Sequence, residues 1–126
     1  MIEDGIVAPN RTYKTWVVDL VSGNRVLLHS LWELSLYESA KENNIDLSRD
    51  HGIRIKYTDF SSGEEHNYIP DFWCDSIKTL YEVKGRFTNR DSIKFSAAIE
   101  WCNKNHAQFI VISDKRFLRE YFSLNK

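Results

Sequence analysis

Two short apolar runs near the start of the chain predict a β-hairpin. Residues 12–20 (TYKTWVVDL) and 25–30 (RVLLHS) are rich in apolar and β-branched residues, and the VSGN between them is a turn signal. The next segment, SLWELSLYESAKENN (30–44), has apolar residues at helical spacing and few helix breakers, so it predicts a helix. Residues 1–12, which include the Pro-Asn pair at 9–10, are expected to form a flexible arm.

The middle of the chain predicts three strands. HGIRIKYTDF (51–60) alternates isoleucine and tyrosine with arginine and lysine, which is typical of a half-buried strand. SSGE (61–64) predicts a turn. In YIPDFWCDSIKTLYEVKG (68–85), two apolar and aromatic stretches flank DSIK, which predicts a second hairpin.

The last third predicts a helix, a strand and a helix. NRDSIKFSAAIEWCNKN (89–105) places Phe95, Ala98, Ile99 and Cys102 at i, i+3, i+4 and i+7, an amphipathic pattern. AQFIVIS (107–113) is wholly apolar at its centre, as expected of a strand covered on both faces. We expect Asp114 to cap a final helix whose apolar stripe contains Phe117, Leu118, Tyr121 and Phe122.

The predicted order is therefore a hairpin, a helix, three strands, a helix, a strand and a helix, which indicates an α/β sandwich around a mixed sheet. At 126 residues and 14.9 kDa, without repeats or linkers, the chain is expected to form one domain over residues 1–126. No stretch approaches the ~20 apolar residues of a membrane span, and the N-terminus lacks signal-peptide features. The two cysteines and four histidines have no zinc-site spacing, so a reduced, cytoplasmic setting without zinc is expected.

Charge is distributed unevenly along the chain. The formal net charge is only −1, which alone argues against tight binding of nucleic acid. However, residues 1–76 hold 7 Lys and Arg against 13 Asp and Glu, a net of −6, whereas residues 77–126 hold 10 against 5, a net of +5. Chance scatter of solvated charges explains this asymmetry as well as a basic functional surface does.

Charged side chains interrupt the predicted second hairpin. Side chains alternate faces along a strand, so Glu82 and Lys84 share one face, and pairing of the two strands can place Asp71 beside Glu82. Two buried carboxylates repel each other and need a positive partner, either Lys84 or a divalent cation. Hard oxygen ligands suit Mg²⁺. Pro70 cannot donate to a sheet ladder, so it predicts a bulge or an edge where Asp71 is presented.

Each of these features also has a simpler explanation. An acid-x-Lys triplet occurs about once by chance in a chain this charged, and a purely structural ion pair gives the same pattern. Glu33 lies on the apolar stripe of the first predicted helix, which suggests a third carboxylate directed at the core. Ser30-x-x-Glu33 is equally a capping box, in which Glu33 accepts from the Ser30 amide. The two interpretations of Glu33 are compatible.

In combination these residues resemble a known family. Pro70-Asp71 followed, after a ten-residue gap, by Glu82-Val83-Lys84 is similar to the signature of the PD-(D/E)XK nuclease superfamily. The HSLWE helix resembles the Glu-bearing helix of many members, and the predicted αβββαβ order matches their restriction-endonuclease-like core. The resemblance covers residues 26–112, with the N-terminal β-hairpin and C-terminal helix as additions. More narrowly, the chain looks like small phage and mobile-element endonucleases: homing-type enzymes, junction-resolving enzymes and transposon endonuclease subunits.

The resemblance implies a metal-dependent endodeoxyribonuclease that hydrolyses phosphodiester bonds in DNA. Asp71, Glu82 and the Val83 carbonyl would hold Mg²⁺, for which Mn²⁺ can substitute. Glu33 would bind that ion through water or hold a second one. Lys84 would orient the attacking water or stabilise developing negative charge, and the products would be a 5′-phosphate and a 3′-hydroxyl.

The resemblance also suggests partners. Arg86, Arg90 and Lys94 would contact DNA phosphates, although each could equally be a solvated surface charge. A homodimer or a partner subunit could supply specificity, and no membrane partner is expected. We expect site-specific, homing-type cleavage and a role in DNA recombination, in the host cytoplasm if the chain is phage-encoded. The alternatives are a Holliday-junction-resolving endonuclease and a DNA-binding module of the same fold that does not cut.

Overall fold

The computed structural model describes residues 14–116 and 118–124, so the arm expected at residues 1–12 lies outside the described residues. The chain begins with the predicted hairpin, β2 (Thr15–Val18) antiparallel to β3 (Arg25–Leu28). The buried Asp19 closes its turn by accepting from the amides of Val21 and Ser22. The first helix, α1 (Leu31–Glu42), follows directly, as predicted.

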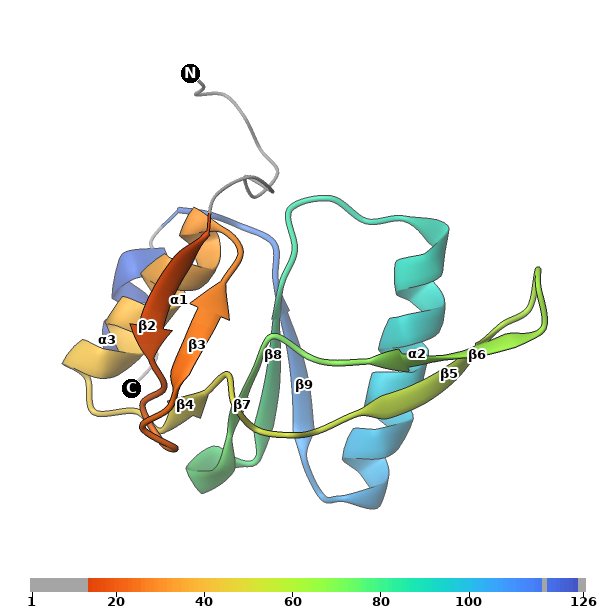
Figure 1. The fold of residues 1–126 in the computed structure, drawn as a ribbon, viewed down its shortest axis with the longest axis horizontal. Helices are drawn as coiled ribbons and strands as arrows, with labels where there is room; N and C mark the ends of the chain where they lie inside the picture. Colours follow the sequence, from red (N-terminus) through yellow and green to blue (C-terminus); the bar gives the residue numbers. More distant parts are fainter. Residues whose placement is uncertain (1–13, 117, 125–126) are drawn as a thin grey trace.

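A four-stranded mixed sheet forms the centre of the molecule (Figure 1). Its order is β4 (Leu47–Ser48), β7 (Phe72–Cys74), β8 (Thr79–Val83) and β9 (Gln108–Ile112). The first two pairings are antiparallel, and β8–β9 is parallel. A short 3₁₀ turn, η1 (Asp75–Ile77), joins β7 to β8 and confirms the predicted second hairpin. All five residues of β8 are buried, because neighbouring strands and both covering layers enclose it.

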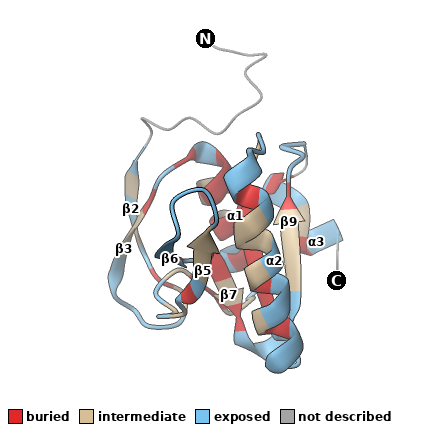
Figure 2. Cartoon of the chain, turned by 90° about the vertical axis from the view of Figure 1, so that its right-hand side faces the viewer, coloured by how far each residue is buried: buried red, intermediate tan, exposed pale blue. Residues whose placement is uncertain are grey.

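Two layers cover the sheet (Figure 2). On one face, α1 packs with the C-terminal η2 (Leu118–Glu120) and α3 (Tyr121–Leu124), and their apolar side chains meet Tyr81 and Val83 of β8. On the other face, α2 (Asn89–Lys104) packs with a separate hairpin, β5 (Ile55–Asp59) and β6 (Glu64–Tyr68). Leu80 of β8 is buried in that second layer. The alternation along β8 thus sends one set of side chains into each layer.

The three strands predicted in the middle of the chain are arranged differently from expectation. The segment 51–60 supplies β5, but β5 pairs only with β6, a polar strand that its composition did not reveal. The two-residue β4 takes its place in the central sheet. Between these two pairings, six residues (49–54) lie opposite four (69–72), so the hairpin is irregular there. Pro70 lies in this break, as predicted, because it cannot donate to a ladder.

Three smaller expectations need correction. Ile99 was predicted to lie on the buried stripe of α2, but it is 51% exposed, and Trp101 packs inward instead. β9 is an edge strand whose residues are mostly half-buried, because nothing pairs with its outer side in the described sheet. The predicted C-terminal helix is reduced to η2 and α3, and Phe117 lies outside the described residues. Within the described residues, no helix is both long and apolar enough to cross a membrane.

Candidate active site

Asp71 lies at the break of the irregular hairpin, directly before β7. Its Oδ2 accepts a hydrogen bond of 2.8 Å from the Val83 amide, which fixes the carboxylate against β8. Its Oδ1 lies 3.3 Å from the Nη1 of Arg49, and the same Nη1 donates to the Asp71 main-chain carbonyl at 3.2 Å. The carboxylate is therefore held in place by contacts from two separate segments.

Glu82 is the second carboxylate, on the buried strand β8, and is only 8% exposed. Phe72 pairs with Tyr81, so the same antiparallel register extended by one residue places Asp71 opposite Glu82. The Tyr68 hydroxyl donates to Glu82 Oε1 at 2.6 Å. A hydrogen bond from the Asp71 main-chain amide and the charges of Lys84 and Lys94 also favour the ionised form of Glu82.

Glu33 occupies the first turn of α1, where Ser30 is the N-cap. Ser30 Oγ accepts from the Glu33 amide at 3.1 Å, which confirms half of the predicted capping box. The Glu33 carboxylate, however, accepts from the amide of His29, at 2.9 Å, and not from that of Ser30. Its Oε1 also lies 3.5 Å from Arg49 Nη1. The Ser30 half of the capping box is therefore present, the bond from the Ser30 amide is replaced by one from the His29 amide, and the Glu33 carboxylate lies beside Arg49.

Arg49 is a site residue that the sequence did not reveal. Its guanidinium bridges Glu33 and Asp71, and it also lies 5.8 Å from the ring centre of Phe72. It comes from the irregular segment 49–54, which follows no strand or helix periodicity, so no pattern could have marked it. His51 supports the same segment: its Nε2 lies 2.8 Å from the Pro70 carbonyl, and its Nδ1 accepts from the Ile53 amide.

The basic cluster predicted after Glu82 is only partly assembled. Lys84 lies 3.4 Å and Lys94 lies 3.8 Å from Asp91 Oδ1, so the two lysines share one buried carboxylate. Asp91 Oδ2 in turn accepts from the Thr88 amide at the start of α2. Arg90 points elsewhere and pairs with Asp59 at 3.8 Å. The fourth basic residue of this cluster, Arg86, is exposed just after β8.

Electrostatics indicate that this site needs additional positive charge. Burial raises the pKa of Asp71 well above its usual range, and the neighbouring charges of Glu82 and Glu33 raise it further. Burial also raises the pKa of Glu82, although the hydrogen bond from Tyr68 and the charge of Lys84 oppose that effect. Burial and the Glu82 charge raise the pKa of Tyr68, which therefore stays a neutral donor.

The donor set fits a divalent cation in part. Carboxylate and carbonyl oxygens are the ligands that Mg²⁺ prefers, and the buried Glu82 lies opposite Asp71. Among the described residues, no group of three or more acidic, His or Cys side chains converges closely enough to hold a metal ion. The position of Arg49 explains this, because its guanidinium lies between Glu33 and Asp71. The residues that could hold the ion directly are therefore Asp71, Glu82 and a main-chain carbonyl. Glu33 lies on the other side of the Arg49 guanidinium.

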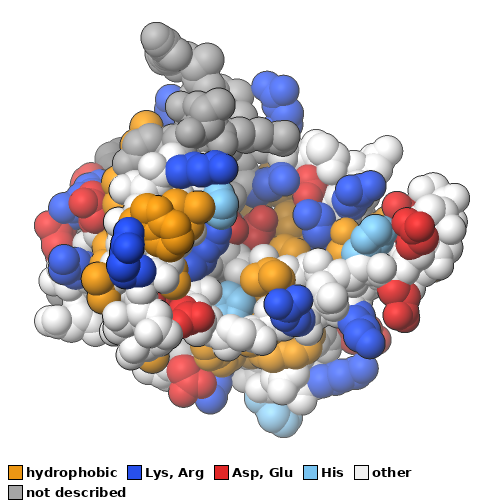
Figure 3. Space-filling model, in the orientation of Figure 1, with side chains coloured by type: hydrophobic (Ala, Val, Ile, Leu, Met, Phe, Trp, Pro, Cys, Tyr) orange, Lys and Arg blue, Asp and Glu red, His pale blue; other side chains and the backbone are white. Residues whose placement is uncertain are grey.

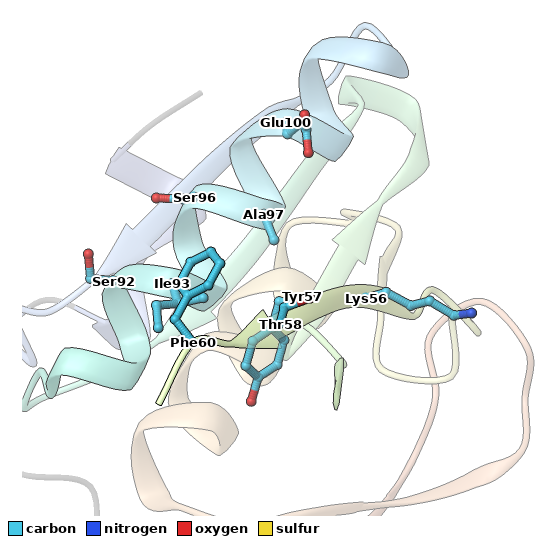
Figure 4. A pocket seen from close by; sticks show the side chains of 9 residues that line it. All are labelled: Lys56, Tyr57, Thr58, Phe60, Ser92, Ile93, Ser96, Ala97 and Glu100. Carbon is cyan, nitrogen blue, oxygen red and sulfur yellow. The ribbon is translucent and has the colours of Figure 1, made fainter. Parts of the chain in front are cut away.

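The surface of the molecule agrees with this location. On the face seen in Figure 3, acidic side chains lie near the middle, flanked by Lys and Arg side chains. A separate groove of about 550 Å³ lies between β5 and α2 (Figure 4). It is lined by one carboxylate, Glu100, and by none of the predicted catalytic residues, so it is not the candidate active site.

Comparison with known proteins agrees with the fold. A family model described as restriction endonuclease fold toxin 7 matches residues 40–120, more than half of the chain. The matched segment contains Arg49, Asp71, Glu82 and Lys84, whereas Glu33 and the N-terminal hairpin precede it. No curated protein and no solved structure matches the chain. The predicted restriction-endonuclease-like α/β fold, with a mixed sheet between helices, is confirmed.

Proposed function

This chain belongs to the restriction endonuclease fold toxin family, within the PD-(D/E)XK nuclease superfamily, and we propose that it is a Mg²⁺-dependent endonuclease that hydrolyses phosphodiester bonds in DNA. The observation that carries the proposal is the pair formed by the buried Glu82 and the half-buried Asp71. Burial raises the pKa of both carboxyl groups, and the charges of Glu82 and Glu33 raise that of Asp71 further. Lys84, two residues beyond Glu82 on the same side of the strand, completes the set.

We assign the metal to Asp71, Glu82 and the carbonyl of Val83, with Glu33 as a ligand through water. A bound divalent ion would supply Lewis acidity toward the phosphate and lower the pKa of an attacking water. The Val83 amide holds Asp71 in orientation, and the Tyr68 hydroxyl does the same for Glu82. Both carboxylates are thus oriented before any ligand arrives, which lowers the reorganisation needed on binding.

Lys84 is the residue that acts on the reacting phosphate in this scheme. Its ammonium group is held at 3.4 Å from Asp91, so it is restrained near the strand that bears Glu82. From there it orients the attacking water or stabilises charge that develops on the phosphate. Lys94 shares the Asp91 carboxylate and contacts a neighbouring backbone phosphate, as does the exposed Arg86.

The test of this function is cleavage of supercoiled plasmid DNA with Mg²⁺ or Mn²⁺ over a range of salt concentrations. We expect cleavage by the unmodified chain and a loss of at least a hundredfold in Asp71→Ala, Glu82→Ala and Lys84→Ala. Asp75→Ala is the matched control, because Asp75 is an exposed acid of η1 paired with Lys78. Plasmid left intact by the unmodified chain, or cleaved equally by Asp71→Ala, would contradict the proposal.

The family description favours a toxin over a homing-type or junction-resolving enzyme. A toxic nuclease damages the cellular DNA that it meets, whereas a homing-type enzyme gives a single cut in a matched target. We therefore expect few bacterial transformants from an inducible plasmid that encodes the unmodified chain, and normal numbers for Glu82→Ala. One discrete cut in a mixed DNA population, without toxicity, would favour the homing-type role instead.

A further inference from the structure

The outer face of the β2–β3 hairpin has an unusual combination of side chains. Trp16 lies opposite Leu27 and Val18 opposite Arg25, and directly opposed residues of an antiparallel pair point to the same side. The other side of the hairpin packs on the core through Val17 and Leu28. Because side chains alternate along a strand, the residue before β2 and the residue after β3 also lie on this outer side. We call this set the hairpin face: Lys14, Trp16, Val18, Arg25, Leu27 and His29.

The hairpin face combines exposed apolar area with positive charge. Trp16 is 57% and Val18 is 54% exposed. Lys14 and Arg25 are charged, and His29 is exposed. Within residues 14–29 the acidic residue is Asp19. Its carboxylate is buried in the turn and accepts hydrogen bonds from main-chain amides. A polyanion can therefore approach the hairpin face without repulsion from these strands.

The geometry of Trp16 points to a particular kind of ligand. The guanidinium carbon of Arg25 lies 4.9 Å from the centre of the Trp16 ring, so a cation covers one side of the indole. The exposure of the side chain leaves ring surface open to a second flat group. Nucleic-acid bases stack on aromatic rings in this way. Bases inside a duplex have both of their faces covered by neighbours, so only an unpaired base offers a free face.

The hairpin face also adjoins the candidate active site. His29 directly follows β3, and its amide donates to the carboxylate of Glu33 at 2.9 Å. In the orientation shared by Figures 1 and 3, the hairpin lies in front of α1, and the same side of the molecule displays a hydrophobic cluster ringed by Lys, Arg and His, beside the acidic centre. A strand bound on the hairpin can therefore continue to the carboxylates.

We propose that the hairpin face binds nucleic acid by stacking an unpaired base on Trp16, so that single-stranded or locally opened DNA is held beside the cleavage site. The proposal rests on the proposed function for the identity of the bound polymer. It concerns a part of the chain outside the segment matched by the family model, which begins at residue 40.

The test is fluorescence anisotropy with the full chain in EDTA, where metal-dependent cleavage is prevented. The probes are a short fluorescein-labelled DNA strand and the blunt duplex of the same sequence. We expect tighter binding of the single strand, a loss of about tenfold in Trp16→Ala, and near-normal binding in Trp16→Phe. Arg25→Ala should lower the slope of log affinity against log salt by about 0.7.

Phe60→Ala is the matched control, because Phe60 is an aromatic side chain, 82% exposed, in the loop of the other hairpin. Equal affinity of Trp16→Ala and the unmodified chain would overturn the proposal, as would equal affinity for single strand and duplex. A change from dimer to monomer in Trp16→Ala, with DNA binding unchanged, would assign the face to a second copy and also overturn it. Melting temperatures of the variants identify any loss that results from misfolding.

The outcomes separate this inference from the proposed function. If the unmodified chain cleaves DNA and Trp16→Ala binds and cleaves normally, the role proposed for the hairpin face is refuted and the proposed nuclease function stands. If binding depends on Trp16 and no metal condition gives cleavage, the role of the hairpin face is supported and the proposed nuclease function is refuted.

Discussion

At the scale of single residues, the site is a set of carboxylates with too little compensating charge. Spacing along the sequence was sufficient to predict that Asp71 and Glu82 lie together, because the register of two antiparallel strands brings them opposite each other. Arg49 could not be predicted, since it lies in a segment without periodicity. The Tyr68 contact was equally hidden, because it depends on a strand whose other residues are polar.

Glu82→Gln should reveal the excess of negative charge. The folded chain holds a proton on Glu82 to higher pH than the unfolded chain, so the metal-free protein loses stability as pH rises from about 4.3 through the raised pKa. Glutamine keeps an oxygen for the Tyr68 hydroxyl and has no charge. In EDTA at pH 8 we expect Glu82→Gln to be more stable than the unmodified chain by about 1 kcal/mol, with a smaller difference at pH 5.

Thermal unfolding at both pH values, with and without Mg²⁺, checks this prediction. Burial lowers the pKa of His51, but His51 is present in both proteins and its contribution cancels in the difference. Glu100→Gln, an exposed acid of α2, is the control. A melting temperature that falls equally at both pH values in Glu82→Gln would indicate an ordinary structural ion pair.

Arg49→Met should separate two roles of the arginine. The guanidinium compensates Glu33 and Asp71 in the metal-free protein, so its removal should lower the free energy of unfolding by about 1–3 kcal/mol at pH 8. It also competes with a cation for the same oxygens, so the rise in melting temperature on adding Mg²⁺ should be larger than in the unmodified chain. Arg54→Met, an exposed arginine of the same segment, should change neither quantity.

At the scale of secondary-structure elements, long periodic segments were predictable and short or polar ones were not. Both main helices and the hairpin β7–β8 follow the predicted pattern. β4 has two residues, which is too short for any alternation to be recognised, and tertiary pairing alone defines it. Ile99 fits the apolar spacing of α2 but is exposed, whereas Trp101 of the same helix packs against the core. The surface on which the helix packs, and not the spacing, decides which side is buried.

The irregular segment between the β4–β7 and β5–β6 pairings, residues 49–54 opposite 69–72, supports the site. His51→Ala removes a donor from the Pro70 carbonyl and an acceptor from the Ile53 amide, so we expect a loss of about 1–3 kcal/mol in stability. Asp71 directly follows Pro70, so cleavage should fall as well, although His51 does not contact the reacting atoms in our scheme. Chemical denaturation and plasmid cleavage measure the two effects, with Arg54→Ala as the control. Normal cleavage by a destabilised variant would show that the break does not position Asp71.

At the scale of the whole molecule, the mixed sheet flanked by helices agrees with the sequence prediction, while the placement of the outer hairpins required the structure. Hydrophobic alternation determines which face of a strand is buried, but it does not say against which layer. The β5–β6 hairpin therefore could not be placed against α2 from its sequence. The candidate site combines residues from α1, the irregular segment and β8. Residue spacing predicted Glu33, Asp71 and Glu82, whereas nothing in the sequence predicted Arg49.

The parallel pairing of β8 with β9 has a consequence for how the chain is made. Every proposed catalytic side chain lies at or before residue 84, but the strand that closes the sheet beside Glu82 spans Gln108–Ile112. In a chain that emerges from the ribosome, the proposed catalytic acids and Lys84 therefore appear before the strand that covers the edge of β8 has been synthesised. Activity should therefore arise only after residues 108–112 have been synthesised, so a chain released before that point would carry the whole motif and remain harmless to the cell that produced it.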